Sequence, residues 1–313
     1  MKIGLIDVDG HNFPNIPLMK ISAWHKRQGD IVEMYSPLFT GHCDIVYMSK
    51  VFSFTPDFQY YIDADRVIKG GSGYAIQTIN GREIYKKEND QQLPEEIEHI
   101  YPDYDLYPEL CKDTAYGFLT RGCPRGCDFC HVKDKEGRRS IKVADLSEFW
   151  RGQKNIVLCD PNLIACKEWK ELLQQLIDSK AKININQGID IRMMDEEKAE
   201  MIKKLRVESV HFAWDRYEDK EKIIPKFKAF QEITGWGNRK LNVYVLVNFN
   251  TTLEQDLERI YTLRDMGYTP YVMVYDREHT KSTDTVRMLQ RWVNNKRIFR
   301  TTARFEEYDP KRG

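Results

Sequence analysis

Apolar residues recur along this chain in two patterns, short runs typical of buried strands and longer stretches with helical spacing. In the second half the two patterns alternate with regularity. Predicted strands cover residues 116–120, 155–159, 182–186, 209–213, 241–247 and 270–275, and predicted helices cover residues 143–151, 167–179, 195–205, 220–233, 252–266 and 283–293. Six strand–helix units in succession predict an α/β fold with a parallel sheet, curled into a partial (β/α)6 TIM-like barrel, and helices outside it.

The first 87 residues show the same alternation on a smaller scale. Strands are predicted at residues 2–7, 31–35, 44–48 and 66–68, and residues 16–28 have an amphipathic helical pattern. We therefore expect a small Rossmann-like domain at residues 1–87. Residues 88–110 are acidic and rich in proline, which predicts a linker. The second predicted domain, the barrel, covers residues 111–313.

Composition narrows the classes of function. The 313 residues suggest two domains, at roughly 150 residues each. Lys+Arg and Asp+Glu are equal at 48 each, so nucleic-acid binding is not indicated. No apolar run approaches the ~20 residues of a membrane span, and the segment Met1–Asp7 is too short and too soon acidic for a signal peptide. These features predict a cytoplasmic protein that does not bind membranes.

Three of the seven cysteines, Cys123, Cys127 and Cys130, lie close together with the spacing Cys-x3-Cys-x2-Cys. In a reducing compartment such clustering indicates metal binding or redox chemistry. The three thiols follow the first predicted strand of the barrel in a Gly/Pro-rich loop, so all three could wrap one iron–sulfur cluster. A four-iron cluster with three cysteine ligands keeps one iron open for a substrate or cofactor.

The alternative is a non-catalytic module that docks a protein partner, in which the cysteine loop binds a redox cluster or zinc. The zinc site would use the same cysteines and His131. Zinc accepts three cysteines and one histidine, but its ligands usually come from two separated knuckles. No second knuckle is visible in the sequence. The loop position and the missing knuckle therefore favour the cluster.

The cysteine motif, with the aromatic Phe129 before its last cysteine and six strand–helix units after it, resembles that of the radical S-adenosylmethionine (radical SAM) superfamily. The resemblance covers residues 112–300. It implies a 4Fe-4S cluster on Cys123, Cys127 and Cys130, with S-adenosylmethionine bound to the open iron. An electron from a donor such as flavodoxin or ferredoxin would cleave the sulfonium bond, and the 5′-deoxyadenosyl radical would abstract a hydrogen atom from a substrate. The resemblance leaves the substrate and the final reaction open.

The resemblance also implies that polar residues at the strand ends contact S-adenosylmethionine. Besides Phe129, the candidates are Asp160, Asn162, Gln187, Arg192, Asp215, Asn248 and Asn250. Each could equally belong to an ordinary turn or helix cap. Thr251 is expected to be a plain N-cap, and His279 a solvated loop histidine.

The remaining cysteines are predicted to play no part in chemistry. Cys43 and Cys159 lie in or beside apolar runs, Cys166 opens a helix, and nothing near Cys111 in the sequence would lower its pKa. The catalytic groups that would handle the substrate are not identified by the sequence.

The N-terminal domain resembles the cobalamin-binding-like domain that precedes the radical SAM core in one large branch of the superfamily. A strand followed by Gly70-Gly71 contributes to this likeness. The cobalamin motif Asp-x-His-x-x-Gly is matched by Asp9 and His11, but Pro14 replaces the glycine. Cobalamin is therefore expected to be absent, with the domain helping to shape the substrate site instead.

Overall fold

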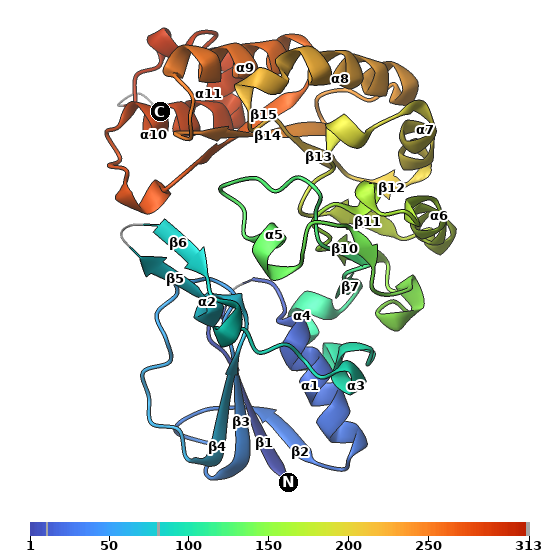
Figure 1. The fold of residues 1–313 in the computed structure, drawn as a ribbon, viewed down its shortest axis with the longest axis vertical. Helices are drawn as coiled ribbons and strands as arrows, with labels where there is room; N and C mark the ends of the chain where they lie inside the picture. Colours follow the sequence, from blue (N-terminus) through green and yellow to red (C-terminus); the bar gives the residue numbers. More distant parts are fainter. Residues whose placement is uncertain (11, 80–81, 311–313) are drawn as a thin grey trace. The chain divides into compact units, whose positions relative to one another are not determined.

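The computed structural model describes residues 1–10, 12–79 and 82–310. The chain forms two compact units, Met1–Pro161 and Asn162–Gly313. Both contain parallel strands with helices between them, so the protein has a mixed α/β fold (Figure 1). No sheet among the described residues is closed on itself. None of the helices in these ranges is long and apolar enough to cross a membrane.

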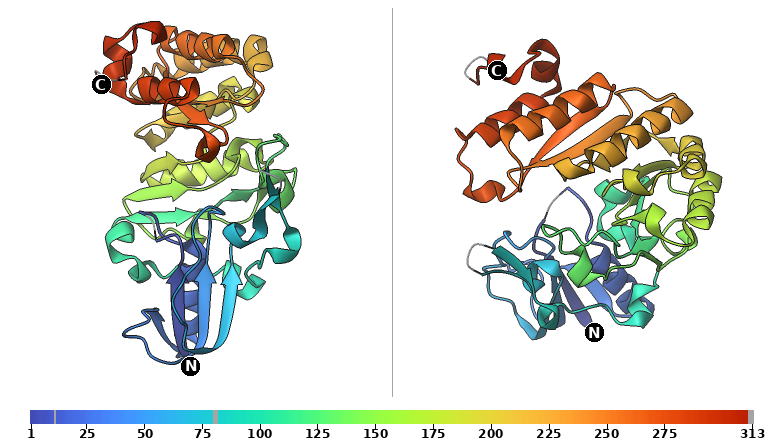
Figure 2. Two further views of the ribbon diagram at one scale, coloured as in Figure 1. Left: turned by 90° about the vertical axis from the view of Figure 1, so that its left-hand side faces the viewer. Right: turned by 45° about the horizontal axis from the view of Figure 1, so that its top comes forward.

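The N-terminal part of the first unit is a four-stranded parallel sheet in the order β2-β1-β3-β4 (Figure 2, left). Its strands are β1 (Lys2–Asp7), β2 (Ile31–Met34), β3 (Cys43–Ser49) and β4 (Ala64–Gly70). Helix α1 (Ile16–Arg27) begins where the side chain of Asn15 accepts from the amide of Leu18 at 3.2 Å. Leu18 then packs with Ile3 and Leu5 of β1. The four strands and the helix predicted for this part of the chain are all present.

The segment predicted as a linker packs against this domain. It contains η1 (Lys87–Asn89), α3 (Glu95–Glu98), η2 (Tyr104–Leu106) and α4 (Pro108–Cys111). Ile97 is buried in the same cluster as Leu18 and Ile21, and Asp103 accepts hydrogen bonds from Ser22 and Lys26 of α1. The acidic residues dominate the composition of the segment, whereas a few buried apolar residues decide its position.

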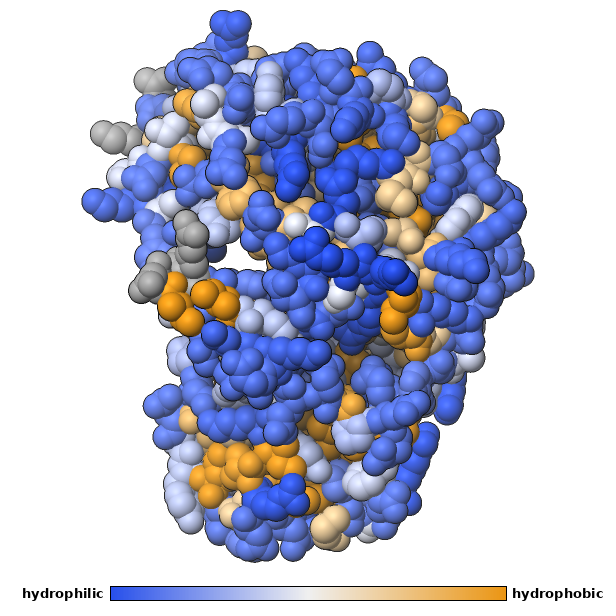
Figure 3. Space-filling view, viewed as in Figure 1, coloured by the Kyte–Doolittle hydropathy of each residue, from blue (hydrophilic) through white to orange (hydrophobic). Residues whose placement is uncertain are grey.

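A hairpin absent from the sequence prediction follows α2 (Ser72–Ala75). Its strands, β5 (Ile76–Ile79) and β6 (Arg82–Tyr85), pair antiparallel. Exposed hydrophobic side chains also occur in the first unit, among them Leu38, Phe39 and Tyr61. Figure 3 shows hydrophobic residues gathered in a patch over the N-terminal domain, on a largely hydrophilic face with a few smaller hydrophobic groups.

The first unit continues past the predicted domain boundary at residue 111. It includes the parallel pair β7 (Thr114–Gly117) and β10 (Asn155–Leu158). Between them lie β8 (Thr120–Arg121), α5 (Val132–Lys135) and β9 (Ile141–Lys142). The predicted strand 116–120 is interrupted after Gly117, because the amides of Leu119 and Thr120 donate to the side chain of Asp160 and not to a neighbouring strand.

The helix predicted at residues 143–151 is wrong. Only the short η3 (Leu146–Glu148) forms there, and a capping box between Asp145 and Glu148 closes this single turn. The aromatic ring of Phe149 then packs directly on Gly117 of β7, where a Cβ atom would lie 2.4 Å from the ring. Packing against the strand therefore ends the turn before a helix can develop.

The second unit contains five strands that the sequence analysis largely anticipated. They are β11 (Lys182–Ile185), β12 (Arg206–Val207), β13 (Val210–Ala213), β14 (Leu241–Val247) and β15 (Thr269–Val274). Strands β11 and β12 pair parallel, as do β13, β14 and β15 in that order. One face of the three-stranded sheet buries Phe212, whose ring contacts Phe227 and Tyr268.

The helices of this unit follow the strands as the alternation predicted. They are α6 (Trp169–Ser179), α7 (Glu196–Lys204), α8 (Lys220–Thr234), α9 (Leu253–Asp265), α10 (Thr285–Asn294) and α11 (Lys296–Thr301). Short 3-10 turns precede or follow them: η4 (Leu163–Ala165), η5 (Ile191–Met193), η6 (Tyr217–Asp219), η7 (Arg277–His279) and η8 (Phe305–Glu307). The C-terminal ends of the strands therefore lead into short turns, where the candidate polar residues lie.

Candidate functional site

The three clustered cysteines lie in the segment between β8 and β9 of the first unit. Cys123, Cys127 and Cys130 are all half-buried. Two backbone hydrogen bonds fold the segment, from the amide of Cys123 to the carbonyl of Gly137 at 3.1 Å and from Cys130 to the carbonyl of Cys127 at 3.2 Å. The structure thus brings the three residues together in one loop, which we call the cysteine loop (residues 121–142).

The donor set of this loop fits an iron–sulfur cluster in its chemistry. Three half-buried cysteines on one short loop match the thiolate ligands that such clusters use. In the described part of the chain, however, no three His, Cys, Asp or Glu side chains are grouped around a common metal position. Ligation would therefore require the sulfur atoms of Cys123, Cys127 and Cys130 to turn toward one another.

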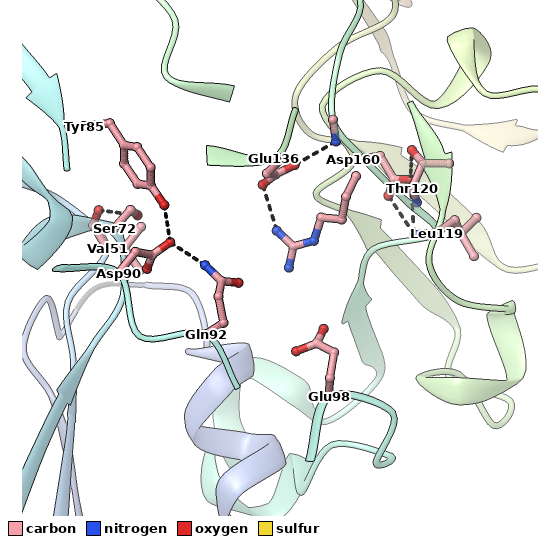
Figure 4. A network of polar contacts seen from close by, with 12 residues as sticks. Val51, Ser72, Tyr85, Asp90, Gln92, Glu98, Leu119, Thr120, Glu136 and Asp160 are labelled. Atoms are coloured by element: carbon pink, nitrogen blue, oxygen red, sulfur yellow. Dashed lines mark hydrogen bonds and ion pairs between the residues drawn. The ribbon is translucent and has the colours of Figure 1, made fainter. Parts of the chain in front are cut away.

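The base of the cysteine loop is closed by Glu136. Its carboxylate accepts from the guanidinium of Arg121 at 2.9 Å and from the amide of Gly122 at 3.0 Å (Figure 4). The Arg121 guanidinium also lies 3.4 Å from the centre of the Phe118 ring. Because Glu136 follows α5 and Arg121 precedes the first cysteine, this contact ties the two ends of the loop together. The sequence analysis missed both residues.

Asp160 lies beneath the start of the cysteine loop and is fully buried. Its carboxylate accepts from the amide of Leu119 at 3.1 Å and from the amide and hydroxyl of Thr120 at 2.5 and 2.7 Å (Figure 4). Burial raises the pKa of Asp160 to about 6, against the hydrogen bonds from Thr120 and Leu119, which lower it. In this structure the carboxylate therefore anchors the loop. Its predicted contact with S-adenosylmethionine stays a prediction.

His131, the fourth ligand in the zinc alternative, is turned toward the β5–β6 hairpin. Its Nε2 atom lies 3.3 Å from one carboxylate oxygen of Glu83. The other carboxylate oxygen of Glu83 accepts a hydrogen bond from the hydroxyl of Ser53. The Nε2 atom of His131 is therefore engaged by the carboxylate of Glu83. This contact gives no support to a site made of three cysteines and this histidine.

Arg192 and Gln187, both after β11, have contrasting surroundings. The Arg192 guanidinium donates to Asp190 and to Asp219, each at 2.7 Å, and its side chain is only 14% exposed. Burial lowers the pKa of Arg192, but the two carboxylates outweigh it and hold the pKa above its usual value. Gln187 is exposed at the strand end. Of these two candidates, Gln187 is the more accessible to a ligand.

The candidates after β13 and β14 occupy tight turns. Asn248 and Asn250 are exposed and have positive φ angles of 64° and 54°. The Asn248 side chain donates to the carbonyl of Tyr275 at 2.9 Å, which links the ends of β14 and β15. Asp215 is half-buried after β13, and Asn162 is almost completely buried before η4.

The N-cap expected at Thr251 is wrong by one residue. Thr252 caps α9 and shares a capping box with Gln255. His279 is 66% exposed and bonds to Asp276, consistent with its prediction as a solvated loop histidine.

A buried ion pair that the sequence analysis missed joins two strand ends. The guanidinium of Arg259 on α9 is fully buried and donates to the carbonyls of Trp214 and Leu246, at 2.6 and 2.7 Å, and to the carboxylate of Asp256. Trp214 directly precedes Asp215, so this contact fixes the backbone next to a candidate residue. The sequence feature that could have revealed this ion pair is the position of Asp256 and Arg259 on the apolar face of α9, beside Ile260.

The part of the N-terminal domain that resembles a cobalamin site is filled by the protein's own contacts. The Asp9 carboxylate accepts from the amides of Val51 and Phe52 and from the hydroxyl of Thr55. A Cβ atom on Gly73 would lie 2.6 Å from the Lys50 side chain. His11 lies outside the described residues. The absence of bound cobalamin therefore stays a prediction.

The four other cysteines lie outside the cysteine loop in the sequence. Cys43, Cys111 and Cys166 are buried, and Cys159 is half-buried. Burial raises the pKa of the Cys111 thiol to about 12, and it also raises that of Cys159 to about 12. The burial of Cys43 and Cys111 agrees with their prediction as unreactive thiols.

Fold and site together define an α/β protein with a closed loop of three cysteines at the end of a parallel strand. No known protein-family model matches the chain, and none of the curated proteins matches it.

Proposed function

We propose that this protein is a radical SAM enzyme that holds a 4Fe-4S cluster with Cys123, Cys127 and Cys130. The observation that carries the proposal is the cysteine loop itself, with three half-buried cysteines in one closed segment after a parallel strand. The six-stranded partial barrel expected from the sequence is part of this proposal. So is the hydrogen abstraction from a substrate that S-adenosylmethionine cleavage would initiate.

The residues around the loop have distinct roles in this proposal. The three thiolates bind iron and leave one iron open, and when bound the cluster supplies the electron that cleaves S-adenosylmethionine. Glu136 holds the loop ends together through Arg121 and the amide of Gly122. Phe129, half-buried and directly before Cys130, is proposed to contact S-adenosylmethionine.

Two groups of strand-end residues contribute in different ways. Gln187, Asp215 and Asn250 are exposed or half-buried and are proposed to hydrogen-bond S-adenosylmethionine directly. Asp160, Asn162, Arg192 and Asn248 are proposed contacts as well. Three of these four, Asp160, Arg192 and Asn248, also make hydrogen bonds that hold the surrounding backbone or side chains. Replacing one of these three residues would therefore lower both the affinity for S-adenosylmethionine and the stability of the protein.

The N-terminal domain is proposed to shape the substrate site without cobalamin. The intramolecular contacts of Asp9 support this proposal, because its carboxylate already accepts hydrogen bonds from the protein. Purification from a host supplied with cobalamin provides the test. Cobalamin that copurifies, and is lost in His11→Ala, would contradict it.

The main experiment is anaerobic purification and reconstitution, followed by incubation with S-adenosylmethionine and a reductant. We expect brown protein with about four irons per chain and formation of 5′-deoxyadenosine. Cys127→Ala should lose both, while Cys111→Ala, which alters a buried thiol away from the loop, should keep both. Colourless protein with one zinc per chain would instead support a non-catalytic module.

A further inference from the structure

Basic residues are concentrated in the cysteine loop. Although the whole chain has equal numbers of basic and acidic residues, 48 of each, residues 121–142 depart from this balance. The loop contains the basic residues Arg121, Arg125, Lys133, Lys135, Arg138, Arg139 and Lys142, and the acidic residues Asp128, Asp134 and Glu136. The excess of positive charge is therefore a local property of the proposed site.

Several of these charges are neutralised by ion pairs. Arg121 pairs with Glu136 at 2.9 Å, Lys133 with Asp128 at 3.7 Å, and Lys142 with Asp145 at 2.7 Å. Arg138 and Arg139 are exposed. In the part of the chain that the structure describes, neither of them forms an ion pair. These two guanidinium groups therefore give the outer surface of the loop its positive charge.

Arg138 also lies directly on the backbone between two cysteines. Its Nη1 atom is 3.0 Å from the position that a Cβ atom on Gly126 would take, and Gly126 directly precedes Cys127. A partner that binds Arg138 would thus come within a few ångströms of the proposed cluster ligands. Ile141, which is 53% exposed, adds an apolar side chain close in sequence to the two arginines.

We propose that Arg138, Arg139 and Ile141 form the docking surface for an acidic electron-transfer protein, and this inference rests on the proposed function. One electron passes from the reduced donor to the cluster, so the donor is oxidised and the cluster reduced by one electron, without a bond being formed or broken. Electron-transfer complexes have small interfaces, and complementary charges raise their rates of association. The exposed Arg138 and Arg139 supply positive charge that an acidic donor would complement.

The test compares a protein donor with a small reductant. The double variant Arg138→Glu/Arg139→Glu and the parent are reconstituted, and 5′-deoxyadenosine formation is followed with limiting reduced flavodoxin, an acidic protein, or with dithionite. At low ionic strength we expect the flavodoxin-supported rate of the variant to fall by about 10-fold or more, with the dithionite-supported rate unchanged. Added salt should slow the parent with flavodoxin but have little effect on the variant.

The matched control is Lys204→Glu/Lys228→Glu, which reverses two exposed charges in the second unit. It should behave like the parent with both reductants. An unchanged flavodoxin-supported rate in the arginine variant, or an equal loss with dithionite, would overturn the docking surface. A parent protein that cleaves no S-adenosylmethionine with either reductant would overturn the proposed function, and this inference with it.

Discussion

The carboxylate of Asp160 accepts hydrogen bonds from both the amide and the hydroxyl of Thr120, at 2.5 and 2.7 Å, although the two residues are 40 positions apart. Thr120 stands three residues before the first clustered cysteine. The contact therefore joins the end of strand β10 to the start of the cysteine loop. It makes the geometry of the loop depend on a side chain outside it.

Replacing Asp160 should reveal this anchoring role. Asp160→Ala leaves the amides of Leu119 and Thr120 and the Thr120 hydroxyl without their acceptor. Since each buried unsatisfied group costs about 1–3 kcal/mol, we expect a loss of about 3 kcal/mol or more in the free energy of unfolding. Asp160→Asn keeps an acceptor and removes the buried charge, so its change should be below about 1 kcal/mol. Urea denaturation of both variants provides the measurement, and similar small losses in the two would contradict the role.

Asp160 should also make stability depend on pH. Its pKa is about 6 in the folded protein against an ordinary value of 3.8, so the folded state holds the proton more tightly than the unfolded chain. The stabilisation is fully present below about pH 4 and is lost as the pH rises through about 6. The difference between the two pKa values corresponds to about 3 kcal/mol in the free energy of unfolding.

This pH effect is measured as the difference in unfolding free energy between the parent and Asp160→Asn from pH 4 to pH 7. The Asn variant serves as the control because it lacks the titrating group but keeps all others. We expect the parent to lose stability relative to the variant over this range. A difference that does not change with pH would show that Asp160 keeps its ordinary pKa.

The cysteines should separate into two groups by reactivity in the iron-free protein. Cys123, Cys127 and Cys130 are half-buried, whereas Cys43 and Cys111 are buried. With the pKa of Cys111 raised to about 12, only about one in 10⁴ of its molecules is a thiolate at pH 8. Iodoacetamide should therefore modify the three loop cysteines first and the two buried ones only after denaturation, as followed by mass spectrometry. Modification of Cys111 at the rate of the loop cysteines would contradict its assignment.

Replacing a strand-end candidate should lower either the affinity for S-adenosylmethionine alone or both affinity and stability, depending on the residue. Gln187→Ala removes an exposed side chain, so we expect S-adenosylmethionine affinity to fall by about 2- to 10-fold with no change in stability. Arg192→Ala breaks ion pairs to Asp190 and Asp219 and should also cost about 3 kcal/mol of stability. Calorimetric binding to reconstituted protein and thermal denaturation provide the two readouts. If Arg192→Ala and Asp160→Ala both bind like the parent, the proposed set of contacts is wrong.

Local patterns in the sequence were sufficient for much of the second unit. The run Leu241–Val247 was predicted with its correct bounds because a continuous apolar segment between polar ones leaves little choice but a buried strand. The cysteine loop also follows strands, although the strand predicted at residues 116–120 is interrupted after Gly117. In contrast, the predicted helix at residues 143–151 failed because packing of Phe149 on Gly117, a contact between distant residues, decided the local structure.

The contacts that shape the candidate site could not be read from local patterns. Arg192 was predicted to contact S-adenosylmethionine, and in the structure it binds carboxylates of the protein, one of them 27 residues away. Glu136 looked like one acidic residue in a charged stretch, although its carboxylate closes the loop. A side chain with spare hydrogen-bonding capacity can be recognised in a sequence, but its partner is chosen by the three-dimensional fold.

The contact of Gly122 with the far side of the cysteine loop limits which amino acids can occupy position 122. With its φ angle of 83°, a Cβ atom at position 122 would lie 2.1 Å from the carbonyl oxygen of Arg139, which is backbone and cannot swing aside. Gly137 also has a positive φ angle, of 94°, but it faces open space. A randomised library of the loop should thus tolerate asparagine at position 137 and nothing but glycine at position 122. Residues on the outer surface of the loop can therefore be replaced, whereas Gly122, where the two sides of the loop meet, cannot.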